Sequence, residues 1–160
     1  MVKVGDKVPH ATLRMIGPEG PKPVTTEELF PKGKKVVAFA LPGAFTPTCS
    51  AKHVPGFVSS FDQIKAKGVD TIACISVNDA WVMDAWGKDQ GVGDKIVMLA
   101  DGSGDFAEAM GLAFDGSGFG LGKRTKRYAA VIEDGVVTHL DVDESGGVQV
   151  SSCEAVLERI

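Results

Sequence analysis

Cysteine is scarce in this sequence, which has three in 160 residues, and no two stand at the C-x-x-C spacing of a dithiol. An odd number of widely separated cysteines is unlike the disulfide framework of a small secreted domain. The missing C-x-x-C also argues against a thioredoxin-type disulfide oxidoreductase. The three histidines are equally far apart and do not follow the spacing of a zinc site. The spacing therefore predicts no metal site, and we expect no other cofactor.

An excess of positive charge is lacking as well. Lys and Arg number 17 against 21 Asp and Glu, which gives a formal net charge of −4. Nucleic acids and anionic membranes attract a basic surface, so we expect neither as a partner. No run approaches the ~20 apolar residues of a membrane-spanning helix, and the first residues lack the apolar core of a secretory signal. We expect a cytoplasmic protein, or an organellar one if a transit peptide has been removed.

The remaining composition, 44% hydrophobic and 24% charged, is that of an ordinary globular protein. No linker or repeat divides the chain, so we expect one domain over residues 1–160. Apolar runs alternate with helical patterns, which is typical of an α/β fold. We expect strands at 11–16, 35–41, 70–77, 96–100, 128–132 and 136–142. We expect helices at 27–30, 49–67, 79–88 and 105–110, and a last one near the C-terminus.

Local signals define the ends of several expected helices. Their N-caps are expected at Thr25 or Thr26, at Asn78 or Asp79, and at Ser151 or Ser152. Proline lacks a backbone N–H, so Pro55 should kink or divide the helix over 49–67. Three large side chains in the helix over 79–88 are interpreted as packing residues rather than as a cofactor site: Trp81, Met83 and Trp86.

Cys49 stands at a junction between a strand and a helix. The apolar run Lys35–Leu41 stops at Pro42 and Gly43, a short turn follows, and Cys49 comes where the next helix should begin. A helix N-terminus carries unpaired N–H groups and the positive end of the backbone dipole, and both stabilise a thiolate. We therefore interpret Cys49 as a reactive nucleophile rather than as a small buried residue of a core helix.

The residues before Cys49 form the pattern P-x-x-x-T-x-x-C, with Pro42 and Thr46 at its other fixed positions. This arrangement resembles that of peroxiredoxins, and the stretches Pro42–Cys49 and Lys52–Phe57 are similar to their type II, peroxiredoxin-5-like group. The similarity continues through the chain in the family's order, at Ser76–Asp79, Ala85–Trp86, Ala100–Gly102 and Lys126–Tyr128. It implies a thioredoxin-like fold with a central mixed β-sheet flanked by helices.

The resemblance also implies an antioxidant thiol peroxidase that reduces hydrogen peroxide and alkyl hydroperoxides and maintains redox homeostasis. Cys49 would attack the peroxide and become a sulfenic acid. Thr46 would orient the reactants and Pro42 would limit water, although both also fit local roles in capping the helix and ending the strand. Arg127, matched to the family's active-site arginine, would stabilise the thiolate and hold the peroxide oxygens. His53, one helical turn beyond Cys49, is interpreted as structural.

The route by which the sulfenic acid is reduced stays open among three alternatives. We place first its direct reduction by glutaredoxin with glutathione, or by thioredoxin, without an obligatory intramolecular disulfide. A Cys49–Cys74 disulfide comes second: Cys74 matches the second cysteine of plant-like members, but bonding would require local unfolding. A Cys49–Cys153 disulfide comes third, because Cys153 is offset from the position of the C-terminal resolving cysteine in atypical two-cysteine relatives.

Two other functions compete with the enzyme. One is a peroxide sensor or relay, in which oxidised Cys49 passes its oxidation to a partner protein. The other is a thioredoxin-like interaction module with an inert cysteine. Turnover of peroxide separates the enzyme from the module, and fast oxidation with slow recycling favours the sensor. Relatives commonly form homodimers through the edge around the active-site loop, so the resemblance implies a homodimer.

Overall fold

The computed structural model describes residues 1–144 and 147–160 of the chain. The strands are β1 (Thr12–Gly17), β2 (Gly20–Thr25), β3 (Lys35–Ala40), β4 (Thr71–Ser76), β5 (Val97–Ala100), β6 (Ala113–Asp115), β7 (Lys123–Thr125), β8 (Arg127–Glu133) and β9 (Val136–Asp143). The α-helices are α1 (Thr26–Leu29), α2 (Val54–Ser59), α3 (Phe61–Ala66), α4 (Ala80–Asp89), α5 (Asp105–Ala109) and α6 (Cys153–Arg159). A π-helical segment, η1 (Cys49–His53), precedes α2, and a 3₁₀ turn, η2 (Ser117–Phe119), lies between β6 and β7.

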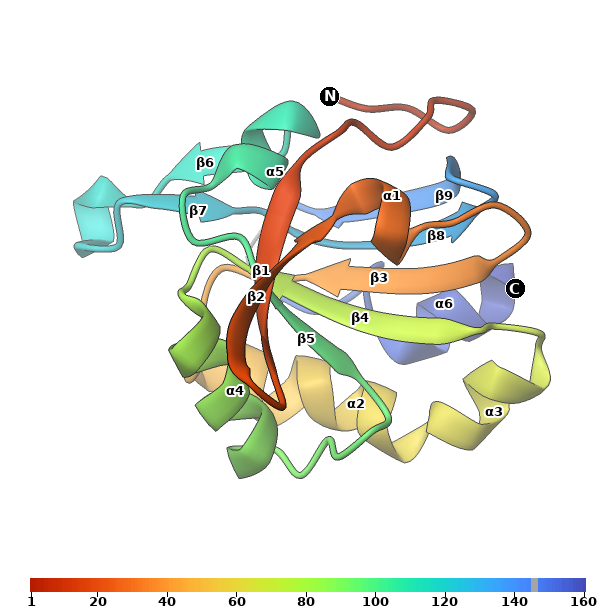
Figure 1. The fold of residues 1–160 in the computed structure, drawn as a ribbon, viewed down its shortest axis with the longest axis horizontal. Coiled ribbons are helices and arrows are strands. Elements are labelled where there is room, and N and C mark those ends of the chain that lie inside the picture. The colour runs from red at the N-terminus through yellow and green to blue at the C-terminus, as the bar shows by residue number, and fades with distance from the viewer. Residues whose placement is uncertain (145–146) are drawn as a thin grey trace.

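The described strands form a seven-stranded mixed sheet in the order β2-β1-β5-β4-β3-β8-β9, with β6 and β7 as a separate pair (Figure 1). Strands β3, β4 and β5 run parallel at its centre. The β8–β9 hairpin extends the sheet antiparallel to β3, and the β1–β2 hairpin completes the other edge. In Figure 1 the β6–β7 pair projects beyond the sheet on the side to which the β3 arrow points. This is the expected thioredoxin-like arrangement.

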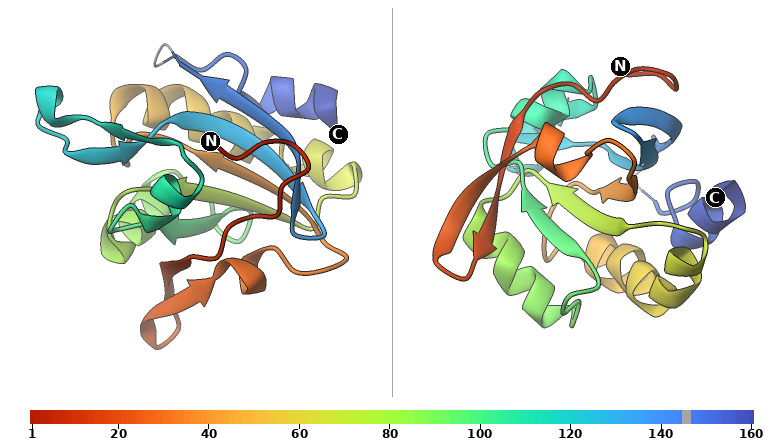
Figure 2. Two further views of the ribbon diagram at one scale, coloured as in Figure 1. Left: turned by 90° about the horizontal axis from the view of Figure 1, so that it is seen from above. Right: turned by 45° about the vertical axis from the view of Figure 1, so that its right-hand side comes forward.

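Helices cover both faces of the sheet, with α2, α3, α4 and α6 on one face and α1 and α5 on the other (Figures 1 and 2). Successive residues of β3 alternate between the two apolar cores: Phe39 packs under the first group of helices, and Ala38 and Ala40 pack under the second. A strand buried on both faces reads as a continuous apolar run, which is why the sequence predicted β3 directly.

Pro55 was expected to kink or divide the helix after Cys49, and the helix instead changes there from π to α without a break. The N–H of Val54 donates to the carbonyl of Cys49, five residues back, and this bond defines the π-helical segment. Pro55 then lies in the first turn of α2, and because it has no N–H it cannot continue the helical bonds of the preceding π-helical segment. The break lies at Ser60, between α2 and α3, and the sequence did not predict that position.

The N-caps agree with one member of each expected pair. Thr25 forms a capping box with Glu28, and Asp79 and Ser152 accept hydrogen bonds from the first turns of α4 and α6. Among the large side chains of α4, Met83 and Trp86 are buried as expected. Trp81 is 64% exposed, so the interpretation of Trp81 as a packing residue is wrong.

Candidate active site

Cys49 lies at the edge of the sheet where the parallel strands end. The chain leaves β3 at Leu41, turns through residues 42–46, and enters a helix at Pro47, two residues before Cys49. The N–H of Ser50 donates to the carbonyl of Thr46 at 3.0 Å, which closes the first helical turn. Cys49 therefore lies within the first turn, near the positive end of the helix dipole, as the sequence predicted.

The guanidinium of Arg127 contacts the sulfur of Cys49, with 3.1 Å between Nη2 and Sγ. The strand pairing explains this contact, because β8 runs antiparallel to β3 and its first residues lie beside the end of β3. Both residues are buried, with 0% of Cys49 and 4% of Arg127 exposed. A buried cation this close interacts strongly with negative charge that forms at this position, because water screens the pair little.

His53 contacts the same guanidinium. Its Nδ1 lies 2.9 Å from Nη1 of Arg127, and its Nε2 lies 2.9 Å from the carbonyl oxygen of Ser151. Arginine can only donate, so Nδ1 accepts and the imidazole proton sits on Nε2. Burial, together with the charge of Arg127, lowers the pKa of His53 to about 4, so the ring is neutral at pH 7. The sequence-based interpretation of His53 as structural missed this contact, for which its spacing from Cys49 was the only signal.

The backbone that supports His53 is itself fixed by a carboxylate. The side chain of Asp143, at the end of β9, accepts hydrogen bonds from the N–H groups of Gln149, Val150 and Ser151 at 3.0–3.1 Å and from the Ser151 hydroxyl at 2.6 Å. Burial acts to raise the pKa of Asp143, but these bonds outweigh it and lower the pKa below its usual value. Because Asp143 stays charged, the Ser151 carbonyl is held where it meets His53.

Pro42 and Thr46 lie in the turn between β3 and the helix, and both are half-buried. The Thr46 hydroxyl donates to the carbonyl of Gly43 at 2.7 Å. The structure thus gives this hydroxyl a partner within the turn, in place of the helix-capping role that its position also suggested. Its oxygen lone pairs remain as acceptors, a point that bears on substrate orientation below.

The other two cysteines are free thiols buried in the same apolar core as Cys49. Cys74 lies in β4 with 0% exposure, and burial raises the pKa of its thiol well above the usual value. Cys153 begins α6 with 2% exposure, and its sulfur lies 3.6 Å from the hydroxyl of Ser60. Burial raises the pKa of this thiol too. Neither thiol is therefore presented to solvent in its reactive form.

Two further observations concern ligands. Over residues 1–144 and 147–160 there is no group of three or more His, Cys, Asp or Glu side chains able to hold a metal ion. In the same ranges, no helix is long and apolar enough to span a bilayer.

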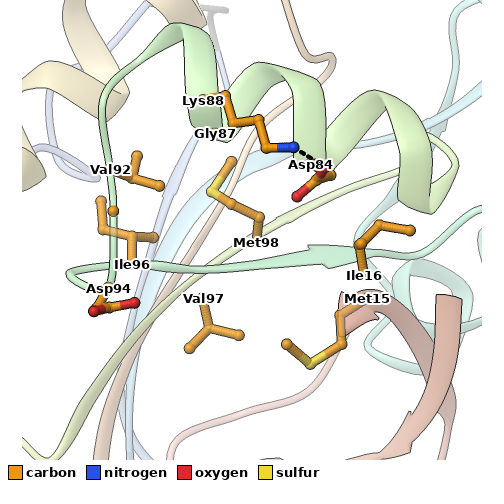
Figure 3. Close-up of a pocket in the computed structure, with 11 residues that line it drawn as sticks. Met15, Ile16, Asp84, Gly87, Lys88, Val92, Asp94, Ile96, Val97 and Met98 are labelled. Carbon is orange, nitrogen blue, oxygen red and sulfur yellow. Dashed lines mark ion pairs between the residues drawn. The ribbon is translucent and has the colours of Figure 1, made fainter. Parts of the chain in front are cut away.

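A cavity of about 460 Å³ lies away from this site, between α4 and the diverging ends of β1 and β5 (Figure 3). The two strands pair at Arg14 and Ala100 and then separate. Apolar side chains dominate the lining, with an ion pair between Asp84 and Lys88 at 3.0 Å. Neither Cys49 nor Arg127 lines this cavity, so it has no direct part in chemistry at the thiol.

Comparison with known proteins agrees with the geometry of the site. The Redoxin family model matches residues 3–157. Peroxiredoxin-2E, chloroplastic, from Arabidopsis thaliana is 48% identical over 99% of this chain and 69% of that protein, and Peroxiredoxin-2B from the same plant is 42% identical over 99% and 98%. The crystal structure of reduced Prx3 from Vibrio vulnificus in complex with H₂O₂ is 50% identical, with a TM-score of 0.95 and 99% coverage of both chains. The chain therefore belongs to the Redoxin family and, within it, to the type II peroxiredoxins, which makes it a thiol-dependent peroxidase.

Proposed function

We propose that Cys49 is the peroxidatic nucleophile of this enzyme and that Arg127 stabilises both its thiolate and the charge of the reaction. The thiolate attacks the terminal oxygen of a hydroperoxide, an S–O bond forms, and the O–O bond breaks. The leaving oxygen takes a proton and departs as water or an alcohol, and the sulfur becomes a sulfenic acid. The observation that carries this assignment is the buried 3.1 Å contact between the Arg127 guanidinium and Sγ.

Arg127 also has a donor group, Nε, that can serve the substrate. Within the described residues, its Nε is buried without a hydrogen-bond partner, whereas Nη1 and Nη2 contact His53 and Cys49. A buried donor without a partner costs about 1–3 kcal/mol, and an oxygen of the substrate would remove that cost. Preorganised donors of this kind stabilise the negative charge that moves onto the leaving oxygen. The H₂O₂ in the V. vulnificus structure supports peroxide as the substrate.

Thr46 and Pro42 complete the proposed site. Because the Thr46 hydroxyl donates its own proton to the Gly43 carbonyl, its oxygen can accept a hydrogen bond from the O–H of a hydroperoxide. That bond would orient the terminal oxygen toward Sγ. Pro42 contributes an apolar ring without an N–H group at the start of the turn, which limits water beside the thiolate.

For recycling, we propose an external thiol: glutaredoxin with glutathione, or thioredoxin. A thiol attacks the sulfenic sulfur, water leaves, and a second thiol then releases Cys49 from the mixed disulfide. Cys74 and Cys153 are both buried, and burial raises both thiol pKa values, so neither favours this attack. Cys49 is itself fully buried, so a protein reductant requires the first helical turn to open. The π-helical segment η1 offers a weaker stretch at which it can do so.

We further propose a homodimer formed through the edge that carries the active-site turn. Two aromatic side chains on this edge are largely exposed, Phe45 in the turn and Trp81 at the start of α4. For location, we propose the cytoplasm, or an organelle if a transit peptide has been removed. The name of the relative Peroxiredoxin-2E, chloroplastic, supports the organelle.

The test is peroxide consumption by the wild type and by Cys49→Ser, Cys74→Ser and Cys153→Ser, with glutaredoxin and glutathione or with thioredoxin as reductant. We expect loss of activity in Cys49→Ser alone. If Cys74→Ser or Cys153→Ser is oxidised normally but fails to recycle, that cysteine resolves the sulfenic acid and the external route is wrong. A wild type that is oxidised once and recycled by neither reductant would favour the sensor or relay.

A further inference from the structure

The turn that leads from β3 to Cys49 is held by side chains from two other parts of the fold, the end of β4 and strand β7, and by one of its own. Its residues are 41–46, and we call it the active-site turn. Four hydrogen bonds join side chains to the backbone of the consecutive residues 41–44. They are Ser76 Oγ to Leu41 O (3.2 Å), Arg124 Nη1 to Pro42 O (3.2 Å), Thr46 Oγ1 to Gly43 O (2.7 Å) and Ala44 N to Asn78 Oδ1 (3.0 Å). Two backbone bonds also reach the turn, from Leu41 N to Ile75 O (3.2 Å) and from Thr46 N to Gly43 O (3.4 Å). Neither involves the carbonyl of Pro42 or the N–H of Ala44, so side chains fix this middle part of the turn.

Arg124 reaches the turn from β7, in the projecting β6–β7 pair. Its Nε donates to the carbonyl of Leu121 at 3.0 Å, so one edge of the guanidinium is fixed to its own loop while Nη1 holds Pro42. A Cβ at Gly43 would lie only 3.0 Å from this Nη1. The lack of a side chain at Gly43 therefore allows Arg124 to approach the turn this closely. The planar fork of arginine suits two carbonyls at once, and lysine cannot reproduce it.

Asn78 reaches the turn from the end of β4. Its Oδ1 accepts from the N–H of Ala44 at 3.0 Å and from the hydroxyl of Ser76 at 2.6 Å. Ser76 is fully buried, and its single proton lies between Asn78 and the carbonyl of Leu41, with the shorter contact to Asn78. These contacts form one connected network. Loss of the Asn78 oxygen would leave the N–H of Ala44 without its partner and the Ser76 hydroxyl with only the longer contact to Leu41.

We propose that Arg124 and Asn78 are positioning residues for peroxide reduction, which fix the active-site turn so that Thr46 and Cys49 keep their relative placement as the peroxide reacts. This inference rests on the proposed roles of Cys49 and Thr46. Neither Arg124 nor Asn78 touches the peroxide. They act through the Gly43 carbonyl, which orients the Thr46 hydroxyl, and through Thr46, which begins the helix of Cys49. A displacement of about 1 Å in such a site can cost roughly 100-fold in rate.

The test compares two reactions of Cys49 that differ in what they require. Reduction of peroxide needs the placement of Thr46, whereas alkylation of the thiolate by iodoacetamide does not. The indole N–H of Trp86 bonds to the hydroxyl of Ser50 at 2.9 Å, so Trp86 fluorescence can report oxidation of the neighbouring Cys49. A Trp81→Phe background removes the signal of the exposed second tryptophan.

In this background we expect Arg124→Met and Asn78→Leu to lower the second-order rate of oxidation by peroxide roughly 10- to 100-fold. Their alkylation rates should equal or exceed that of the parent, because the Arg127 contact is untouched and the turn is looser. Asn78→Asp keeps an acceptor at the same place and should recover most of the peroxide rate. Arg14→Met is the matched control, since Arg14 also donates to a backbone carbonyl, that of Leu13, but outside the turn.

Three outcomes overturn the proposal: an unchanged peroxide rate in Arg124→Met and Asn78→Leu, an equal fall in both reactions, or no recovery in Asn78→Asp. Melting temperatures identify any variant that has lost its fold, and Arg124→Lys then replaces Arg124→Met, with the same expected loss of peroxide rate. Failure of the proposed function looks different, because the parent protein itself would then not be oxidised at Cys49.

Discussion

The imidazole of His53 lies between a permanent cation at Nδ1 and a backbone carbonyl at Nε2, so its single proton is on Nε2. Protonating the ring would require Nδ1 to give up its bond from Arg127 and would bury two adjacent positive charges. This explains why the pKa falls to about 4 from the usual 6.5. A neutral His53 accepts a hydrogen bond from Arg127 without neutralising the positive charge of Arg127. That charge therefore remains available to Cys49 and the substrate.

The first prediction concerns the pH dependence of stability at His53. Well above pH 6.5 the ring is neutral in both the folded and the unfolded state, so it adds no dependence. Between pH 6.5 and about 4, the unfolded chain binds a proton that the folded protein does not, so the free energy of unfolding falls as pH falls. The depressed pKa corresponds to a loss on the order of 3 kcal/mol across this window.

His53→Gln preserves an acceptor toward Arg127 and a donor toward Ser151 but cannot titrate. Urea unfolding of wild type and variant at several pH values between 7.5 and 4 measures the difference. We expect the wild type to lose stability relative to the variant as pH falls. Asp143 and the other carboxylates are common to both proteins, so their titration cancels. Equal slopes would show that folded His53 takes up its proton near pH 6.5.

At the scale of elements, α2 and α6 meet where a glycine faces a cysteine. A Cβ at Gly56 would lie 3.0 Å from the sulfur of Cys153, which α6 places over α2. Two effects then oppose each other in Gly56→Ala. Alanine favours the helix by about 1 kcal/mol, and overpacking costs about 1–3 kcal/mol. We therefore predict that Gly56→Ala destabilises the wild type.

The sign of this effect should reverse when the sulfur is removed. In a Cys153→Ala background the new methyl group has room, and the helix preference of alanine remains, so Gly56→Ala should stabilise by up to about 1 kcal/mol. The coupling is read from a double-mutant cycle of unfolding free energies. Destabilisation of equal size in both backgrounds would mean that contacts other than the sulfur oppose the methyl group. Peroxidase turnover in Cys153→Ala should persist, because the proposed reductant is external.

The elements also differ in how far the sequence predicted them. The apolar runs predicted β3, β4 and β8 because these strands are buried on both faces. Strand β2 was missed because its sequence, GPKPVT, contains two prolines. The sheet tolerates them at its edge, where β2 pairs with β1 alone. Strands β6 and β7 are three residues each, too short for a periodic pattern.

At the scale of the whole molecule, the site combines what is local in the sequence with what only the fold brings near. Pro42, Thr46 and Cys49 are recognisable together because they lie close together in the sequence, in the active-site turn and at the start of the helix after it. Arg127 is 78 residues from Cys49, and only a family resemblance could suggest it. The contacts of Arg124 and Asn78 were not predicted, since each depends on where a distant element meets the active-site turn. Spacing along the chain carries no information about such contacts.

The last prediction concerns assembly. Phe45 has a positive φ of 63°, a conformation that an aromatic residue adopts at a cost, and its side chain is 51% exposed. The strained turn thus directs an apolar ring toward solvent, 6.4 Å from the indole of Trp86, while Trp81 is exposed on the same helix. Burial against a second copy would recover the hydrophobic free energy of these rings, about 25 cal/mol per Å².

We expect sedimentation equilibrium of the wild type to give a dimer at micromolar concentration, and Phe45→Glu and Trp81→Glu to give monomers. A carboxylate at the centre of an apolar contact would be buried without a partner, which opposes association strongly. Val4→Glu, which changes another exposed apolar residue outside this edge, is the control and should remain dimeric. A wild type that stays monomeric at high concentration, or Glu variants that still dimerise, would place the contact elsewhere. A monomer would also leave the exposed rings of Phe45 and Trp81 free for the reductant, which has to reach Cys49 at the same edge.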